Sequence, residues 1–256
     1  MPDFATRVLS SPLGRPALFS AGQAGYIIKS SSGQLLAWDL YLSCCGERIE
    51  QSVGFKRLLP EILSPRDLVF DYIIASHPHF DHFDPDSIPG LMADQRTRLF
   101  ASVDCRALAE KRLLDESRIT YVAPGQTYQA GDFTIAFVNC NHGTGAPDAV
   151  GAVITVDDKK IYFAGDTCLR LDRADEVLSF GPLDILIAPI NGAYGNLNEH
   201  DCALLSKALS PKLTIPCHYG MFARHGGNPW LFMQDMMSEC PDNKYCLMCM
   251  GEEIFL

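Results

Sequence analysis

Three histidines and two aspartates lie within nine residues of the sequence, in the stretch SHPHFDHFD. His77 and His79 are two positions apart, so on an extended segment their side chains point the same way and can bind one metal ion. Asp81 and His82 follow where the chain turns, and they can face a second ion that the first pair does not reach. Zinc, iron and manganese all accept imidazole together with carboxylate ligands. The spacing therefore predicts a metal site.

A site for two ions needs more ligands, and the sequence offers them where apolar segments end. His142 follows FTIAFVNCN, Asp166 lies in FAGDT, and His218 follows LTIPC. A polar residue in such a place is not needed for packing, and α/β proteins gather ligand groups at strand ends. Cys168 could be an extra ligand, although a buried thiol is the simpler interpretation.

The elements that would position these residues are short strands alternating with helices, with hairpins among them. The hydrophobic patterns predict strands over 17–21, 26–30, 34–39, 67–76, 98–102, 119–122, 133–139, 184–190 and 213–218, and a hairpin that turns at Asp157–Asp158. Helices are predicted near 84–93 and 104–115, over 199–209 with Asn198 as N-cap, and from Pro229 onward. Two sheets covered by helices fit this order better than one doubly wound sheet.

Composition narrows the class of protein. The chain has 256 residues and a net charge of −10, which disfavours nucleic acid as a partner because binding its backbone requires a basic surface. No apolar run reaches the roughly 18 residues of a membrane span, and the N-terminus lacks a signal-peptide core. Ten cysteines without an export signal indicate reduced thiols and a cytoplasmic protein. No linker or repeat divides the chain, so 1–256 is expected to form one domain.

The ligand candidates also resemble a known family. Taken in chain order, they match the metal-binding motifs of the metallo-β-lactamase superfamily. The resemblance implies a four-layer αβ/βα sandwich with a dinuclear site at one edge. It implies that one ion is bound by His77, His79 and His142 and the other by Asp81, His82 and His218, with Asp166 as the bridge. The two ions would be zinc or manganese, with iron a further option.

A narrower resemblance lies in the loops. The stretches GQAGYIIK, APINGAYGNLNEHDCA and PCHYGMFARHGGNP are similar to the L-ascorbate-6-phosphate lactonase branch of that superfamily. This implies a lactonase-like enzyme that acts on ester bonds and opens the lactone of a phosphorylated, sugar-acid-like metabolite. The expected substrate is therefore a small anion. A membrane partner is not expected, and the sequence leaves a homo-oligomer open.

Two bound ions imply the mechanism. A water between two cations loses its proton near neutral pH, and the hydroxide attacks a carbonyl carbon or a phosphorus. Asp81 and Asp166 would offset the metal charge, and Asp166 could also orient the hydroxide. Three residues could protonate the leaving oxygen, in this order of preference: His225, His200 and Tyr194. For each, an ordinary loop, helix-start or packing role is the alternative.

Substrate contacts are expected in the loop NGAYGNLN and after His218. Asn191 and Asn198 could present amides to an anion at a helix N-terminus, although both are also typical turn residues. Tyr194 and His200 lie in the same segment. Arg224 could bind a phosphate with two hydrogen bonds, or it could be a solvated surface arginine.

Two other functions remain open. A phosphodiesterase or nuclease on the same scaffold would use the same ligands, although the acidic charge argues against nucleic acid. A metal-binding protein without catalysis would be expected to lack some of the ligands, and none is missing.

Overall fold

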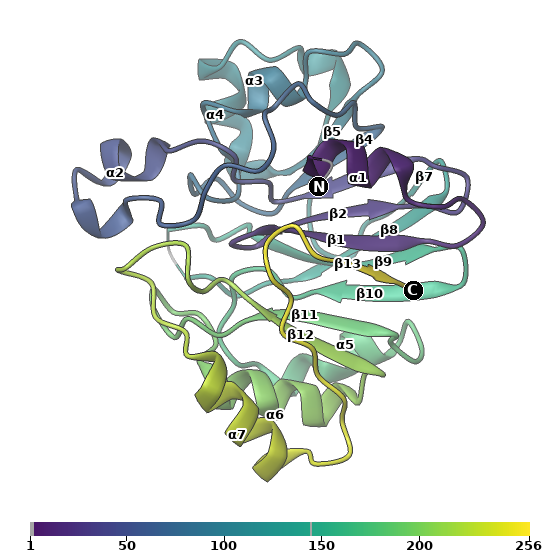
Figure 1. Cartoon of the computed structure of the whole chain (residues 1–256), viewed down its shortest axis with the longest axis vertical. Helices are drawn as coiled ribbons and strands as arrows, with labels where there is room; N and C mark the ends of the chain where they lie inside the picture. Colours follow the sequence, from purple (N-terminus) through teal and green to yellow (C-terminus); the bar gives the residue numbers. More distant parts are fainter. Residues whose placement is uncertain (1–2, 144) are drawn as a thin grey trace.

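The computed structural model describes residues 3–143 and 145–256, which form two β-sheets that pack face to face (Figure 1). The first sheet has the strand order β13-β1-β2-β3-β4-β5-β6, and the second has the order β12-β11-β10-β9-β8-β7. In the first sheet the bounds are β1 Ala17–Gly22, β2 Gly25–Lys29, β3 Leu35–Trp38, β4 Tyr72–Ala75, β5 Arg98–Ser102, β6 Ile119–Val122 and β13 Glu253–Phe255. In the second they are β7 Thr127–Ala130, β8 Phe133–Asn139, β9 Val150–Val156, β10 Lys159–Phe163, β11 Ile185–Pro189 and β12 Leu213–Cys217.

Helices cover the outer face of each sheet. Their bounds are α1 Phe4–Ser10, α2 Cys45–Glu50, α3 Ile88–Leu91, α4 Arg106–Lys111, α5 Ala174–Leu178, α6 Glu199–Leu209 and α7 Pro229–Glu239, with short 3₁₀ turns at η1 Val53–Phe55, η2 Val103–Cys105, η3 Glu116–Arg118 and η4 Leu171–Arg173. Helices α1, α3 and α4 share a buried hydrophobic cluster with the first sheet, and α5, α6 and α7 share another with the second. The expected four-layer αβ/βα sandwich is confirmed.

The core between the sheets consists of the inward-facing side chains of both. Trp38 of β3 stacks on Phe163 of β10, with ring centroids 4.7 Å apart, and both rings are buried. Alternating strand residues point to opposite faces, so one face of each strand reaches this core and the other reaches the helices. Such large apolar side chains dominate the free energy of burial, at roughly 2–3 kcal/mol each.

Strand direction brings distant residues to one edge of the sandwich. Strands β3, β4 and β5 are parallel, as are β10, β11 and β12, and β8 runs in the same direction as β10 because both are antiparallel to β9. The loops that follow β4, β8, β10 and β12 therefore meet. These four loops carry the predicted metal ligands.

Most predicted elements are confirmed, with corrections to their length. The strand expected over 67–76 is only β4, because Leu68 and Phe70 are buried in a turn and not in a strand. The helices expected near 84–93 and 104–115 are also shorter. Pro89 and Gly90 lie inside α3 and limit it, and α4 stops before Leu113, whose φ is +54°. Helices α1, α2 and α5 and strands β7 and β13 were not predicted.

Asp84 lies just beyond the metal motif and holds the loop after β3 in place. Its buried carboxylate accepts hydrogen bonds from the backbone N–H groups of Leu42 and Ser43 and from the Ser43 hydroxyl, at 2.8–3.0 Å. It also accepts from the backbone of the turn that leads into α3. The residue fixes the segment that begins α2.

Replacing this carboxylate should cost stability. Asp84→Ala leaves buried N–H groups without acceptors, so we expect the free energy of unfolding to fall by about 3 kcal/mol. Asp86→Ala is the matched control: its carboxylate is partly exposed and pairs with Arg48 and Arg112, so its loss should cost about 0–1 kcal/mol. Urea unfolding of both variants measures the difference. Equal midpoints would contradict this role for Asp84.

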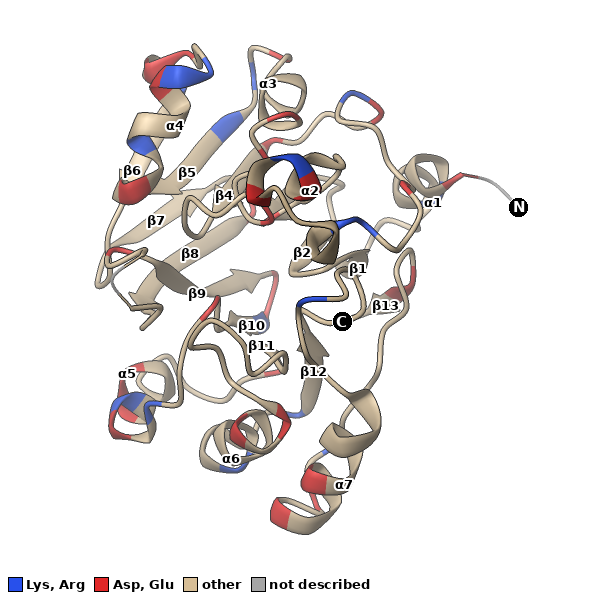
Figure 2. Cartoon of the chain, turned by 90° about the vertical axis from the view of Figure 1, so that its left-hand side faces the viewer, with Lys and Arg blue, Asp and Glu red and all other residues tan. Residues whose placement is uncertain are grey.

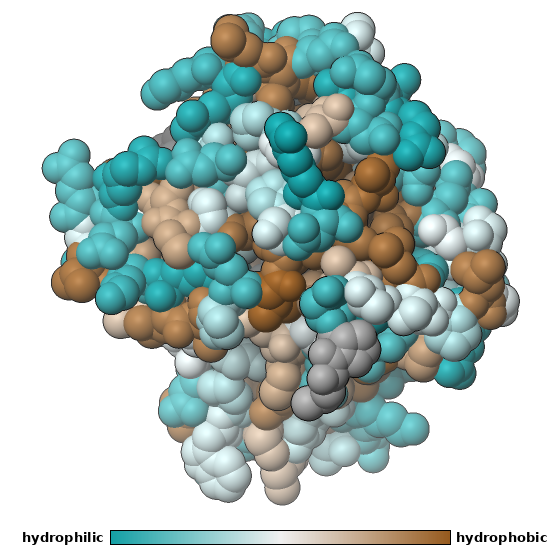
Figure 3. Space-filling model, turned by 45° about the horizontal axis from the view of Figure 1, so that its top comes forward, coloured by the Kyte–Doolittle hydropathy of each residue, from teal (hydrophilic) through white to brown (hydrophobic). Residues whose placement is uncertain are grey.

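The surface of the molecule is mixed in character. On the face shown in Figure 3, hydrophilic and hydrophobic side chains are interspersed. Within the described part of the chain, no helix has the length and apolar character needed to cross a membrane.

Candidate metal centre

Three histidines from two loops form the first group of side chains that could hold a metal ion. His77 and His79 follow β4, and His142 follows β8. His77 Nε2 lies 2.9 Å from His79 Nδ1, which in turn lies 3.1 Å from His142 Nε2. Three ring nitrogens thus converge on one point, within 4.8 Å of one another.

The second group lies beside the first. His82 Nε2 is 3.1 Å from His218 Nε2, and the Asp81 carboxylate lies 3.3 Å from the same His218 nitrogen. Asp166 stands between the groups. Its oxygens are 3.4 Å from His82 Nε2, 3.2 Å from His218 Nε2 and 3.8 Å from His142 Nε2. The seven predicted ligands therefore lie together, and one carboxylate reaches both groups.

These distances fit divalent metal ions. Two ligands bound tetrahedrally at about 2.0–2.1 Å from one ion lie roughly 3.3 Å apart. The neighbouring ligand atoms here are separated by 2.9–3.8 Å. A neutral histidine ring has one donor nitrogen and one acceptor nitrogen. Ring nitrogens that face one another at such distances therefore cannot all be hydrogen-bonded to one another. A shared cation satisfies all of them at once.

Charge in the second group holds its members ionised. Burial alone would raise the pKa of Asp81 and Asp166, but the positive charges of His82 and His218 outweigh it and lower both pKa values. Burial likewise opposes protonation of the two histidines, and the surrounding carboxylates outweigh it. The pKa of His218 rises to about 9, and that of His82 rises well above its usual value.

The first group behaves in the opposite way. Burial and the charge of His82 hold the pKa of His77 well below its usual value. Burial lowers the pKa of His142 to about 4, against the attraction of Asp166. Neutral imidazole is the form that binds a metal ion, so this group is ready to coordinate at neutral pH.

Three buried side chains that were not predicted hold the ligands in place. Asp39 accepts a hydrogen bond from His82 Nδ1 at 2.7 Å. Gln23 Nε2 donates to Asp81 at 2.8 Å, and Asn196 Nδ2 donates to Asp166 at 2.8 Å. Such partners fix the orientation of a ligand, and the Asp39 carboxylate also raises the basicity of the His82 ring.

A signal for one of these three residues was present in the sequence. Asp39 follows the apolar strand LLAW, so the rule that pointed to Asp166 applies to it equally. Gln23 lies in the stretch GQAGYIIK, but nothing in the residue type marks it as a partner of a carboxylate 58 positions away.

Asp39 should control metal affinity through His82. In Asp39→Asn the amide no longer holds the imidazole by a charged hydrogen bond, so we expect the affinity for the second ion to fall by about 10- to 100-fold. Competition with a chelating dye measures it. Asp94→Asn, at a remote loop where the carboxylate pairs with Arg96, is the control and should leave metal affinity unchanged. Equal affinities in both variants would refute the role of Asp39.

Unusual backbone angles help to place two ligands. His218 has φ +64°, a conformation that non-glycine residues rarely adopt, and its backbone N–H donates to the Gln23 carbonyl at 2.9 Å. Strain of this kind concentrates at functional sites. Gly165, with φ +66°, precedes Asp166, and a Cβ at Gly165 would lie only 3.0 Å from the Val150 carbonyl oxygen. The turn that presents Asp166 therefore requires glycine.

A cavity of about 220 Å³ opens onto the two groups. Besides metal-binding side chains, it is lined by Glu50, Phe55, Phe80, Tyr194 and His225. Glu50 is the last residue of α2, and Figure 2 views the molecule from the side on which α2 lies. Glu50, Phe55 and Phe80 were not predicted as site residues.

Two of the predicted substrate or acid residues lie at this cavity. The His225 ring stacks on the His218 ring, with centroids 4.8 Å apart, and its Nδ1 lies 3.0 Å from Gln23 Nε2. Burial and the charge of His218 lower the pKa of His225 to about 4. The Tyr194 ring lies 5.6 Å from the His225 ring and is 53% exposed, so it is accessible to a ligand.

The structure places the other predicted residues away from the cavity lining. Asn198 caps α6 in a capping box with Asp201, so its side chain is already used. His200 lies on the first turn of α6, with Nδ1 3.6 Å from Asp235 of α7. Arg224 is exposed and is not among the described lining residues.

Asn191 is the remaining predicted contact. It is buried, and its Oδ1 accepts from Asn196 at 3.1 Å. Its side chain therefore supports the amide that holds Asp166, and it does not line the cavity in the described part of the chain.

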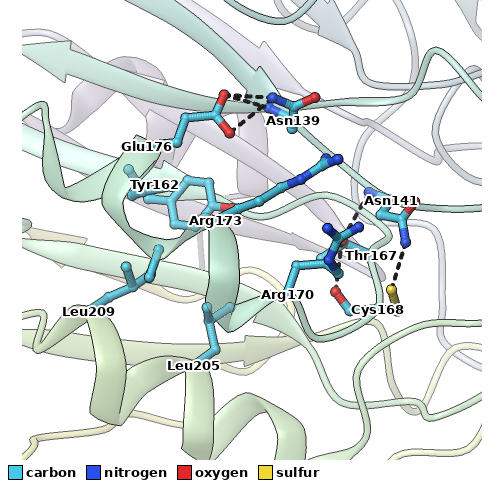
Figure 4. Close-up of a pocket in the computed structure, with 12 residues that line it drawn as sticks. Asn139, Asn141, Tyr162, Thr167, Cys168, Arg170, Arg173, Glu176, Leu205 and Leu209 are labelled. Atoms are coloured by element: carbon cyan, nitrogen blue, oxygen red, sulfur yellow. Dashed lines mark hydrogen bonds between the residues drawn. The ribbon is translucent and has the colours of Figure 1, made fainter.

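Figure 4 shows another cavity, whose lining includes Asn141 and Thr167, the sequence neighbours of His142 and Asp166. It has a volume of only about 30 Å³, room for about one or two waters. Cys168 lies here, with Sγ 2.8 Å from Asn141 Nδ2, and it is in none of the metal-binding groups. Its predicted role as an extra ligand is therefore not supported.

Comparison with known proteins shows which superfamily the chain belongs to. The family model described as a beta-lactamase superfamily domain matches residues 18–218, which is most of the chain. The chain belongs to the metallo-β-lactamase superfamily. It is 28% identical over 222 residues to a UPF0173 metal-dependent hydrolase of Anaeromyxobacter dehalogenans, with 81% of this chain and 76% of that protein covered. The branch of L-ascorbate-6-phosphate lactonases does not emerge from these comparisons.

Solved structures share the fold. Igni18, a metallo hydrolase of Ignicoccus hospitalis, superposes with a TM-score of 0.73 at 21% identity, covering 94% of this chain and 98% of that one. A protein of Veillonella parvula described as a possible metal-dependent hydrolase superposes with a TM-score of 0.75 at 15% identity, covering 95% and 100%.

Proposed function

We propose that the chain is a metal-dependent hydrolase that binds two divalent ions, zinc or manganese, in the two groups. The observation that carries the proposal is the position of Asp166, whose carboxylate lies within 3.8 Å of ligand nitrogens from both groups. A bridging carboxylate is expected of a dinuclear site that catalyses hydrolysis. The names of the relatives in the UPF0173 family support the same class of activity.

When bound, the ions would supply Lewis acidity and would lower the pKa of a coordinated water towards neutral pH. The chain's own residues orient the reactants. Asp81 and Asp166 are acceptor-only when ionised, so they offset the positive charge and can hold a water by its hydrogens. Gln23 and Asn196 fix these carboxylates, so the arrangement exists before substrate binds.

His225 would assist at the substrate oxygen as a hydrogen-bond donor. The amide of Gln23 donates to His225 Nδ1, so the remaining proton of the neutral ring is on Nε2. The lowered pKa keeps the His225 ring neutral. A neutral ring is suited to stabilising negative charge by donating a hydrogen bond. It is less suited to acting as an acid that gives up its proton. His225 therefore takes precedence over His200 and Tyr194 in this role.

We propose ring opening of a lactone as the reaction. The cavity is small, and an ester carbonyl is neutral and needs no cationic side chain. Hydrolysis of a phosphodiester is the second candidate, because the same metal ligands serve it. Its phosphate, however, would have to be recognised without an arginine or lysine among the described lining residues.

The test is to reconstitute the purified protein with zinc or manganese, measure bound metal, and assay a panel of lactones and phosphodiesters. Two ions per chain and turnover of a lactone that His79→Ala abolishes are expected. Two bound ions without turnover of any compound, or activity that survives His79→Ala, would overturn the proposed function.

A further inference from the structure

The wall of the cavity that faces the metal-binding groups is aromatic. Phe55 and Phe80 are both less than 10% exposed, and their rings meet edge to face at 5.9 Å. Tyr194 stands beside them, with its ring 6.1 Å from that of Phe55. Together with His225, whose ring lies 5.6 Å from that of Phe55, they form a continuous aromatic surface.

The charged side chains that line this cavity, apart from its histidines, are all acidic. Among the described residues that line it, none is a lysine or an arginine, whereas Glu50 lies at its wall. Arg57 is close in sequence, but its guanidinium donates to the backbone carbonyls of Tyr41, Ser43 and Leu59 at 2.9–3.2 Å. The carboxylates of Asp81, Asp166 and Glu50 bring three negative charges, which largely offset two divalent ions.

Such a wall favours some substrates and penalises others. A flat or apolar group gains burial and ring contacts against aromatic side chains, worth about 0.5–1.5 kcal/mol for each ring pair. A phosphate or carboxylate pressed against the same wall loses its hydration without gaining a charged partner. At about 220 Å³ the cavity is also smaller than the roughly 300–1,000 Å³ of a typical ligand site.

We infer that the cavity takes a small, uncharged cyclic ester whose flat apolar part lies against Phe55, Phe80 and Tyr194, and that Glu50 selects against anions. The inference rests on the proposed hydrolysis. It replaces the expectation of an anionic, phosphorylated substrate, which depended on Arg224 and on the loop asparagines. None of those residues is among the described lining residues, and the Asn198 side chain caps α6.

The test compares neutral and charged lactones with the metal-loaded protein. We expect kcat/KM for dihydrocoumarin, a neutral aromatic lactone, to exceed that for 6-phosphogluconolactone by at least about 100-fold. Tyr194→Ala should raise KM for dihydrocoumarin up to about tenfold and leave KM for γ-butyrolactone, which has no aromatic ring to stack, within about twofold. Phe55 is also part of the core, so it is replaced by leucine, which keeps the apolar bulk. Phe55→Leu should likewise raise KM for dihydrocoumarin.

Glu50 supplies a second, independent arm because it is exposed and can be changed without disturbing the core. Glu50→Lys should raise kcat/KM for 6-phosphogluconolactone by about tenfold, and Glu50→Gln by less. A preference of the unaltered protein for the phosphorylated lactone, or an equal effect of Tyr194→Ala on both neutral lactones, would overturn the inference.

A binding measurement separates this inference from the proposed reaction. Chroman is the cyclic ether that corresponds to dihydrocoumarin and cannot be hydrolysed, and its binding can be followed by ligand-observed NMR. If no lactone is turned over, the proposed function fails, and chroman binding that Tyr194→Ala weakens still supports the aromatic site. If chroman does not bind, the inferred substrate class is wrong whether or not the protein hydrolyses lactones.

Discussion

His79→Ala is expected to lower kcat/KM for the best lactone by at least about a thousandfold, and to reduce bound metal from two ions to one. His79 Nδ1 lies within 3.1 Å of both other nitrogens in the first group, so its loss leaves that group with two ligands. The second group does not contain His79 and should still bind. The loss therefore isolates the contribution of the first ion.

His200→Ala is the matched control. It removes the same side chain from the first turn of α6, where His200 faces Asp235 and is not part of the cavity lining. Elemental analysis and steady-state kinetics on both variants give the comparison. We expect His200→Ala to keep two ions and its activity. If His79→Ala retained both ions, the assignment of the first group as a metal site would be wrong.

Metal binding is expected to release protons at pH 7. His82 and His218 have raised pKa values in the protein without metal, about 9 for His218, so both carry a proton at neutral pH. A metal ion binds only neutral imidazole, so these protons must leave. Affinity for the second ion should therefore rise about tenfold per pH unit for each proton released, up to the raised pKa.

The same shifts determine how the metal-free protein responds to pH. A raised histidine pKa stabilises the fold fully below the unfolded value of about 6.5, and this contribution is lost as pH rises through about 9. Metal-loaded protein has no such loss. The stabilisation by metal, about 4 kcal/mol when free metal is a thousand times its Kd, should therefore grow between pH 7 and 9.

Calorimetric titration at pH 7 in two buffers with different heats of ionisation measures the released protons, and thermal unfolding with and without a chelator measures the stabilisation. Asp39→Asn serves as an internal comparison, because the loss of one carboxylate near His82 lowers the pKa of that ring. It should release fewer protons. Binding without proton release would contradict the ion pairs described for the second group.

The two loops that were expected to contact the substrate show why substrate-binding residues were harder to predict than candidate metal ligands. Asn198 has the residue type of an anion contact and also that of an N-cap, and its distance from Asp201 in the folded helix decides in favour of the cap. Arg224 directly precedes His225, which lines the cavity, yet Arg224 itself is exposed and is not among the described lining residues. Residue type alone does not give side-chain direction in a loop.

The sequence by itself was enough to predict the layered fold and the seven candidate metal ligands, which the structure brings together. The prediction used two local features, namely the polar residues that follow apolar strands and the spacing of His77, His79, Asp81 and His82. Both depend on local geometry that recurs wherever a strand ends. The tertiary structure alone decided the surroundings of that site. Gln23, Asp39 and the aromatic wall with Glu50 come from segments far apart in the chain, and only the packing of the two sheets and α2 brings them to one cavity. Substrate choice resides in those surroundings.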